Sequence, residues 1–109
     1  MSERQENPGI ISYAPKTRLM EIRRTVNIKN FLGLHARASA KLVEVVDRYH
    51  SEIYLKKGER EVDGSNILAI LTLAGTKGST LELRAVGEDA GELLDAVEAL
   101  FERKFGEDE

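Results

Sequence analysis

Cysteine and tryptophan are absent from the 109-residue sequence, and proline occurs only twice. Without cysteine the chain cannot form a disulfide, a zinc–thiolate site or an iron–sulfur cluster, and it has no thiol nucleophile. Long apolar runs are missing as well: the longest, Ile67 to Leu71, is far shorter than the roughly 18 residues that a membrane span requires. We therefore expect a protein that does not insert into membranes and that resides in the cytoplasm.

An excess of basic residues is also lacking. There are 16 lysine and arginine residues against 19 aspartate and glutamate residues, a formal net charge of −3. Nucleic acid is therefore not an expected partner, because phosphate backbones bind basic surfaces. Both prolines lie within residues 1–20, which show neither helical nor strand periodicity. We interpret residues 1–20 as a flexible N-terminal extension and residues 21–109 as the single folded domain.

From Ile22 onward, apolar residues alternate as in strands in some segments and recur at helical spacing in others. The pattern predicts strands at 22–28, 52–56, 60–62 and 81–85, and helices at 36–50, 67–73 and 89–105. The order is β-α-β-β-α-β-α. It indicates an α+β domain in which a four-stranded antiparallel sheet is covered on one face by three helices.

Local signals mark the ends of these elements. Side-chain oxygens in Asp63–Asn66 can cap the second helix, and Asp89 followed by Glu92 resembles a capping arrangement for the third. Gly106 is expected to end the third helix. Arg24 is an exception on the otherwise apolar face of the first strand.

His35 is the last loop residue before the first predicted helix, in the segment Gly33-Leu34-His35-Ala36-Arg37. The free N–H groups and the positive dipole at a helix start favour anions, phosphate above all. The same field disfavours a protonated imidazole, so we expect a neutral, nucleophilic ring. Arg37 offers several donors for phosphate oxygens. These residues could hold a transient phosphoryl group, but they also fit a structural role in which His35 caps the helix and Arg37 is solvated.

His50 closes the predicted first helix and is interpreted as a structural or surface residue. A histidine without cysteines or a carboxylate cluster nearby does not supply the ligands that divalent metals demand. The sequence contains no Ser/His/Asp arrangement, phosphate-cradling glycine loop or H-E-x-x-H pattern. We therefore expect neither a metal nor a cofactor, and we do not interpret the chain as a stand-alone enzyme for a small molecule.

At three places the sequence resembles the HPr family, the histidine phosphocarriers of the bacterial phosphoenolpyruvate-dependent phosphotransferase system. These are Gly33-Leu34-His35-Ala36-Arg37, Asp63-Gly64-Ser65-Asn66-Ile67-Leu68 and Thr76-Lys77-Gly78-Ser79. The resemblance spans about Ile22 to Phe105. The C-terminal residues, from Ala99 to Glu109, are more similar to the nitrogen-regulatory paralogue, NPr, than to the sugar-transport form.

The resemblance implies an HPr-like open-faced β-sandwich that carries a phosphoryl group on the pros nitrogen of His35, with Arg37 supporting the phosphate. It also implies transfer from enzyme I to an EIIA-type acceptor protein by a monomeric carrier without a cofactor. Both partners would dock on a surface that includes Ala36, Leu68 and Leu71. The two leucines fit a simple role in the core equally well.

Two departures from the family pattern bear on this interpretation. Ala38 stands where the family often has proline, and because alanine is a good helix former we expect little functional change. Asn66 aligns with a regulatory serine found in many members, which leaves Ser65, one residue earlier, as the candidate regulatory hydroxyl. Two alternatives stay open. One is a regulatory docking module whose phosphorylation state controls partner proteins. The other is an interaction domain without phosphotransfer, which would need neither His35 nor Arg37.

Overall fold

The computed structural model describes residues 20–109, so all but the last residue of the predicted extension lies outside it. In this part of the chain, no helix is long and apolar enough to cross a bilayer. The elements are β1 (Glu21–Asn27), α1 (Ala36–Val46), β2 (Glu52–Lys57), β3 (Arg60–Asp63), α2 (Ile67–Leu71), β4 (Thr80–Val86), α3 (Ala90–Glu102) and a short 3-10 turn, η2 (Lys104–Gly106). The predicted order of strands and helices is confirmed.

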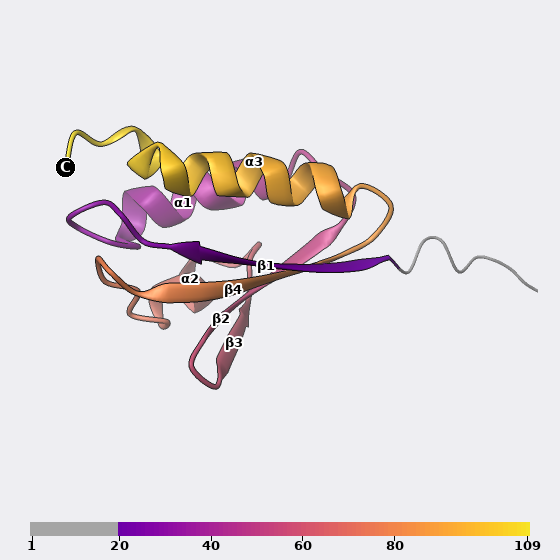
Figure 1. Cartoon of the computed structure of the whole chain (residues 1–109), viewed down its shortest axis with the longest axis horizontal. Coiled ribbons are helices and arrows are strands. Elements are labelled where there is room, and N and C mark those ends of the chain that lie inside the picture. Colours follow the sequence, from indigo (N-terminus) through magenta and orange to yellow (C-terminus); the bar gives the residue numbers. More distant parts are fainter. Residues whose placement is uncertain (1–19) are drawn as a thin grey trace, which may run out of the picture.

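The four strands form one antiparallel sheet in the order β1-β4-β2-β3 (Figure 1). Val26 lies opposite Leu81 and Leu55 lies opposite Leu83, so the apolar side chains of neighbouring strands share one face. Helices α1 and α3 lie side by side over this face, and α2 packs against α1 and β3. The predicted α+β fold is therefore correct.

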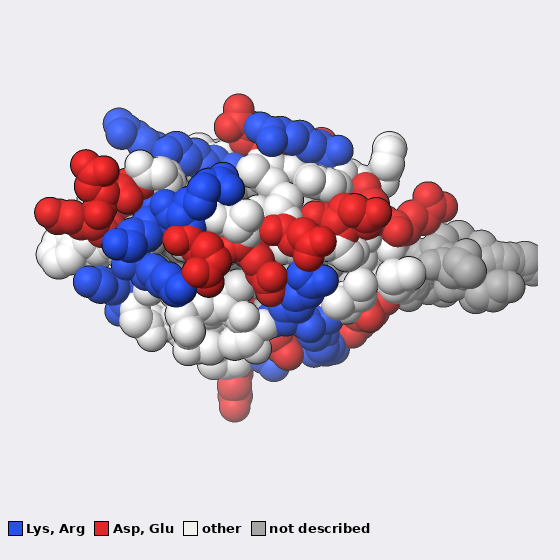
Figure 2. Space-filling model, turned by 45° about the horizontal axis from the view of Figure 1, so that its top comes forward, with Lys and Arg blue, Asp and Glu red and all other residues white. Residues whose placement is uncertain are grey.

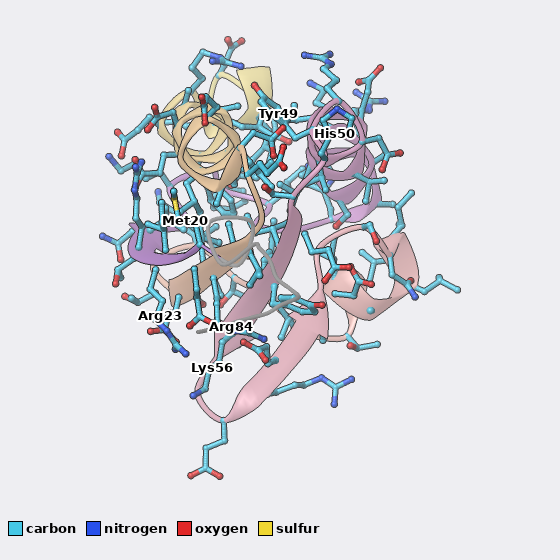
Figure 3. The ribbon with its side chains drawn as sticks, turned by 90° about the vertical axis from the view of Figure 1, so that its right-hand side faces the viewer. Met20, Arg23, Tyr49, His50, Lys56 and Arg84 are labelled. Carbon is cyan, nitrogen blue, oxygen red and sulfur yellow. The ribbon has the colours of Figure 1, made fainter. Side chains whose placement is uncertain are left out.

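The other face of the sheet carries polar and charged side chains. Figure 3 shows Arg23, Lys56 and Arg84 on the side of the sheet away from α1 and α3. Arg84 donates two hydrogen bonds of 3.0 Å to the Glu61 carboxylate and lies 4.4 Å from the centre of the Tyr54 ring. Because this face carries polar and charged side chains, it can remain in contact with solvent and needs no second layer of helices.

Arg24, the exception on the apolar face, lies at the edge of the core. Its guanidinium contacts Asp95 at 2.6 Å and Glu98 at 3.2 Å, and both carboxylates belong to α3. The arginine therefore joins the edge strand β1 to the helix above it.

Several predicted helix ends are wrong, including that of the second helix, which ends at Leu71 and not at Leu73. Helix α1 ends at Val46 and not at His50, because the chain turns through the intervening residues before β2. Asp89 makes no capping hydrogen bond to α3. Its carboxylate instead accepts hydrogen bonds from the Ser51 amide and hydroxyl and from the His50 amide. A long-range contact thus replaces the predicted local one, while Asn66 does cap α2 by accepting from the Ala69 amide at 3.0 Å.

The C-terminal end of α3 also differs from the prediction, which extended the helix to Phe105. The helix ends at Glu102, and Lys104 and Phe105 both adopt a φ of +56°. The Phe105 ring is buried against Phe101, with 5.0 Å between the ring centroids, and the Phe105 carbonyl accepts a 2.7 Å hydrogen bond from Lys41 on α1. This turn directs the last residues toward the loop that precedes α1, and both lie at the left-hand end of Figure 1.

Candidate functional site

The loop before α1 holds His35 at the helix start through contacts with distant parts of the chain. The Leu34 amide donates to the Gly75 carbonyl at 2.9 Å, and the Leu34 side chain is buried. Gly33 adopts a φ of +69°, and a Cβ added there would lie only 2.3 Å from the Gly75 oxygen. Asn30, which is fully buried, donates to the Gly33 carbonyl at 2.8 Å. The backbone that carries the histidine is therefore tightly placed.

His35 is the N-cap residue of α1. Its Nδ1 accepts hydrogen bonds from the backbone amides of Arg37, at 3.2 Å, and Ala38, at 3.4 Å. Its Nε2 hydrogen-bonds the Glu107 carboxylate. A neutral imidazole has one donor and one acceptor nitrogen, so these partners select the tautomer that carries its proton on Nε2. Nδ1 then presents its lone pair toward the helix start.

This geometry combines the two interpretations of His35 that the sequence left open. The ring caps the helix, as the structural interpretation requires, and the helix amides meet the ring at a nitrogen with a lone pair. Because these hydrogen bonds are long, a group attached to Nδ1 could take over the amide donors. The Arg37 side chain is exposed beside the ring.

A shallow depression of about 660 Å³ surrounds the imidazole. It is lined by Phe31, Leu32, His35, Arg37, Glu107, Asp108 and Glu109. Figure 2 shows acidic and basic side chains next to each other at the left-hand end of the molecule, where the C-terminal residues lie. Burial alone would raise the pKa of Glu107, but hydrogen bonds from His35 and Asn30 and the positive charge of Lys41 lower it. Glu107 is thus a carboxylate at neutral pH.

Exposed apolar side chains lie on the loop and on α2. Phe31 and Leu32 are 64% and 66% exposed, and Leu68 is 74% exposed. Leu68 therefore does not belong to the core, whereas Leu71 is half-buried and Ala36 is exposed. Large exposed apolar side chains of this kind are typical of surfaces that bind other proteins.

Ser65, the candidate regulatory hydroxyl, is exposed directly before the cap of α2. Its hydroxyl donates to the Asp63 carboxylate at 2.7 Å, and the same carboxylate accepts from the Ser65 amide at 2.8 Å. The neighbouring Asn66 points its side-chain oxygen to the Ala69 amide. The serine and the capping residue are therefore distinct.

His50 lies far from this site. It is exposed and lies with Tyr49 near the far end of α1 from His35, toward the viewer in Figure 3. Within residues 20–109, no three side chains of the metal-binding types are grouped so that they could hold an ion. The two histidines thus have separate environments.

Sequence reasoning missed several residues that build the site. Asn30 and Gly75 hold the loop, and Phe31 and Leu32 contribute its exposed apolar surface. Glu107 reaches the ring from 72 positions away. The apolar pair Phe31 and Leu32 beside Gly33 was an available local signal, whereas the burial of Asn30 is visible only in the structure. Nothing in the local sequence connects Glu107 with His35.

Comparisons with known proteins show the family of this chain. The family model described as the PTS HPr component phosphorylation site matches residues 22–103. A phosphocarrier protein HPr from Cupriavidus necator is 41% identical over 88 residues, which cover 81% of this chain and 99% of that protein. A phosphocarrier protein NPr from Klebsiella oxytoca is 40% identical over 90 residues, which cover 82% of this chain and all of that protein. The crystal structure of HPr-C-His from Thermoanaerobacter tengcongensis has a TM-score of 0.78 at 35% identity and covers 81% of this chain and 99% of its own. The chain belongs to the HPr family of phosphocarrier proteins.

Proposed function

We propose that this protein carries a phosphoryl group on Nδ1 of His35, accepting it from enzyme I and passing it to an EIIA-type protein. The observation that carries the proposal is the position of Nδ1, which faces the backbone amides of Arg37 and Ala38 at the start of α1. Helix starts bind phosphate through such amides and through the helix dipole. The nucleophile and the groups that would hold its phosphate therefore meet at one point.

The transfer reaction uses this geometry directly. The Nδ1 lone pair attacks phosphorus, and the bond from phosphorus to the donor group breaks with its electron pair leaving on the donor. The two amides then donate to the phosphate oxygens in place of Nδ1. The guanidinium of Arg37, on the surface, can donate to the same oxygens. Return of the electron pair to Nδ1 releases the phosphoryl group to the acceptor.

Protein partners have an accessible surface on which to dock. The exposed side chains of Phe31, Leu32 and Leu68, with Ala36 and the half-buried Leu71, supply apolar area at the ring and on α2. A shallow site rimmed by apolar residues suits transfer between two proteins, since both reacting groups must approach at the surface.

The test is to incubate the purified chain with enzyme I and phosphoenolpyruvate and to follow the intact mass. We expect one acid-labile phosphoryl group per chain, mapped to His35 by peptide mass spectrometry, and its loss on addition of an EIIA protein. A chain that stays unmodified while a known HPr is phosphorylated in the same mixture would contradict the proposal.

A regulatory role is the second candidate. The chain is nearly as similar to a phosphocarrier protein NPr as to a phosphocarrier protein HPr, at 40% and 41% identity. In this alternative the phosphorylation state of His35 reports to partner proteins and does not drive sugar uptake. Phosphoryl transfer rates to a sugar-type and to a nitrogen-type EIIA protein, measured side by side, distinguish the two roles.

A further inference from the structure

The second nitrogen of His35 has a partner that the transfer reaction described above does not use. Nε2 hydrogen-bonds the Glu107 carboxylate, which the turn after α3 brings to the start of α1. Both side chains are largely shielded: 27% of His35 and 21% of Glu107 remain exposed. Because water screens it less, the carboxylate interacts more strongly with the imidazole here than it would in an exposed ion pair.

Glu107 is itself held in place. Its second carboxylate oxygen accepts a 3.0 Å hydrogen bond from Asn30, the buried residue that also binds the Gly33 carbonyl. Two residues further on, the main-chain oxygen of Glu109 accepts a 2.8 Å hydrogen bond from the Phe31 amide. The C-terminal segment is therefore tied to the loop before α1 at two positions, Glu107 and Glu109.

We propose that Glu107 is a positioning residue that keeps a proton on Nε2 of His35 and compensates the positive charge that the ring acquires on phosphorylation. This inference rests on the proposed function. When Nδ1 forms its bond to phosphorus, Nε2 keeps its hydrogen and the imidazole becomes an imidazolium. Glu107 stabilises that cation, just as a carboxylate stabilises the imidazolium that forms during catalysis in hydrolase triads. When the phosphoryl group leaves, the electron pair returns to Nδ1 and no proton has to move.

Other charges face the ring or its carboxylate partner. Arg37 and Lys41 approach from α1, and Asp108 and Glu109 approach from the C-terminal segment. Among the described residues, Glu107 alone makes a side-chain hydrogen bond to the imidazole. We therefore expect its effect on Nε2 to exceed that of its neighbours and to resist salt better.

The phosphotransfer test uses Glu107→Gln, which keeps the shape and removes the charge. Glu102→Gln is the control, because it removes the same charge from the end of α3, where the carboxylate pairs with Lys29. Initial rates of phosphoryl transfer from phosphorylated enzyme I, and onward to an EIIA protein, are measured from about pH 6 to about pH 9, where imidazoles change protonation. For Glu107→Gln we expect rates at least about tenfold lower near pH 8. In Glu107→Gln we also expect the decrease in the rate of onward transfer at high pH to begin at a lower pH. Glu102→Gln should have a pH profile close to that of the protein without substitutions.

A second readout does not depend on phosphorylation. In ¹⁵N-labelled protein near neutral pH, we expect a hydrogen-bonded Nε2–H resonance for His35 that exchanges slowly with water, and faster exchange in Glu107→Ala. An Nε2–H signal that is indifferent to Glu107, or an unchanged pH profile of transfer in Glu107→Gln, overturns the inference. If instead the unmodified protein accepts no phosphoryl group, the proposed function fails, while the NMR result still reports on the carboxylate contact.

Discussion

The two histidines illustrate how position on a helix decides what an imidazole can do. His35 lies at the start of α1, where Nδ1 meets two backbone amides. His50 lies beyond the other end of the helix, and its backbone amide, not its ring, makes the hydrogen bond to Asp89. Helix starts attract anions, whereas helix ends attract cations. Only the first position therefore suits a ring that is to carry a phosphoryl group.

Replacing His35 by alanine is expected to abolish phosphorylation by enzyme I and phosphoenolpyruvate while the domain stays folded. The lost helix cap should lower the free energy of unfolding by about 0.5–2 kcal/mol. Intact mass gives the phosphoryl content, and circular dichroism gives the fold. His50→Ala is the matched control and should be phosphorylated normally. A phosphoryl group on the His35→Ala variant would show that another residue is the acceptor.

Arg37→Ala is expected to slow phosphoryl transfer without stopping it, because the amides at the start of α1 still hold the phosphate. One charge-assisted hydrogen bond contributes about 1.5–3 kcal/mol, so we expect a decrease of roughly 10- to 100-fold in rate. Stopped reactions analysed by intact mass give the rate. Arg48→Ala, which removes an exposed arginine beyond the other end of α1, serves as the control. Equal rates in both variants would return Arg37 to the solvated role.

At the scale of elements, the loop that precedes α1 depends on a close approach of two backbones. Gly33 has no side chain to collide with the Gly75 carbonyl, which also accepts from the Leu34 amide. Gly58, in the turn between β2 and β3, has a similar φ of +61°, but a Cβ added there meets nothing within 4 Å. Both glycines therefore need a left-handed backbone conformation, but only Gly33 also needs the space that a Cβ would occupy.

Gly33→Ala is expected to destabilise the domain by more than about 3 kcal/mol, because the loop must move away from Gly75. Gly58→Ala should lower the free energy of unfolding by only about 1–2 kcal/mol, because alanine disfavours the left-handed backbone conformation. Urea unfolding measures both. The displaced loop should also slow phosphoryl transfer in Gly33→Ala but not in Gly58→Ala. Equal losses of stability would contradict the close approach.

The start of α2 gives a prediction about regulation. We expect no stoichiometric phosphorylation of Ser65 by an HPr-type serine kinase with ATP, because Asn66 occupies the aligned position and the Ser65 hydroxyl is bonded to Asp63. Peptide mass spectrometry locates any phosphate. Asn66→Ser is the positive control, since serine also caps helices and restores a hydroxyl at the aligned position. Stoichiometric phosphorylation of Ser65 in the chain without substitutions would place the protein under kinase control. Such a phosphate would add about −1.5 to −2 charges beside the exposed Leu68.

At the scale of the whole molecule, Asp89 links the start of α3 to the segment between α1 and β2. Its carboxylate accepts from the Ser51 hydroxyl and amide and from the His50 amide, and these hydrogen bonds lower the pKa of Asp89. The folded protein thus binds this proton less tightly than the unfolded chain, in which an aspartate titrates near about 3.9. The stabilisation is complete above that pH and is lost as the pH falls through the lower folded value.

Asp89→Asn is therefore expected to lower the free energy of unfolding at neutral pH by about 1–3 kcal/mol. It should also reduce the difference between the stabilities measured at about pH 7 and about pH 3. Urea unfolding at both pH values tests this. Asp47→Asn removes an exposed carboxylate from the turn after α1, and its effect at neutral pH should stay within about 0.5 kcal/mol. An unchanged pH dependence in Asp89→Asn would rule out this role of the aspartate.

The amino-acid sequence by itself determined the elements of this protein and indicated where its candidate site lies. Period-two and helical patterns depend on neighbours within a few residues, so they predicted four strands and three helices. The polar residues Asp63–Asn66 predicted a cap for the second of these helices. The Gly33–Arg37 segment likewise joins a turn, a histidine and a helix start, and it made His35 and Arg37 the candidates for a phosphate site, with a purely structural role left open.

Tertiary structure alone decided the features that depend on distant partners. The sequence predicted Asp89 as a local cap of the third helix. In the folded chain its carboxylate accepts instead from the amide and hydroxyl of Ser51, which directly precedes β2. The helix pattern continued to Phe105, yet burial of that ring against Phe101 and the hydrogen bond from Lys41 favour a left-handed turn. That turn brings Glu107 to His35. The carboxylate and the imidazole are 72 positions apart, and only the packing of α3 beside α1 makes them neighbours.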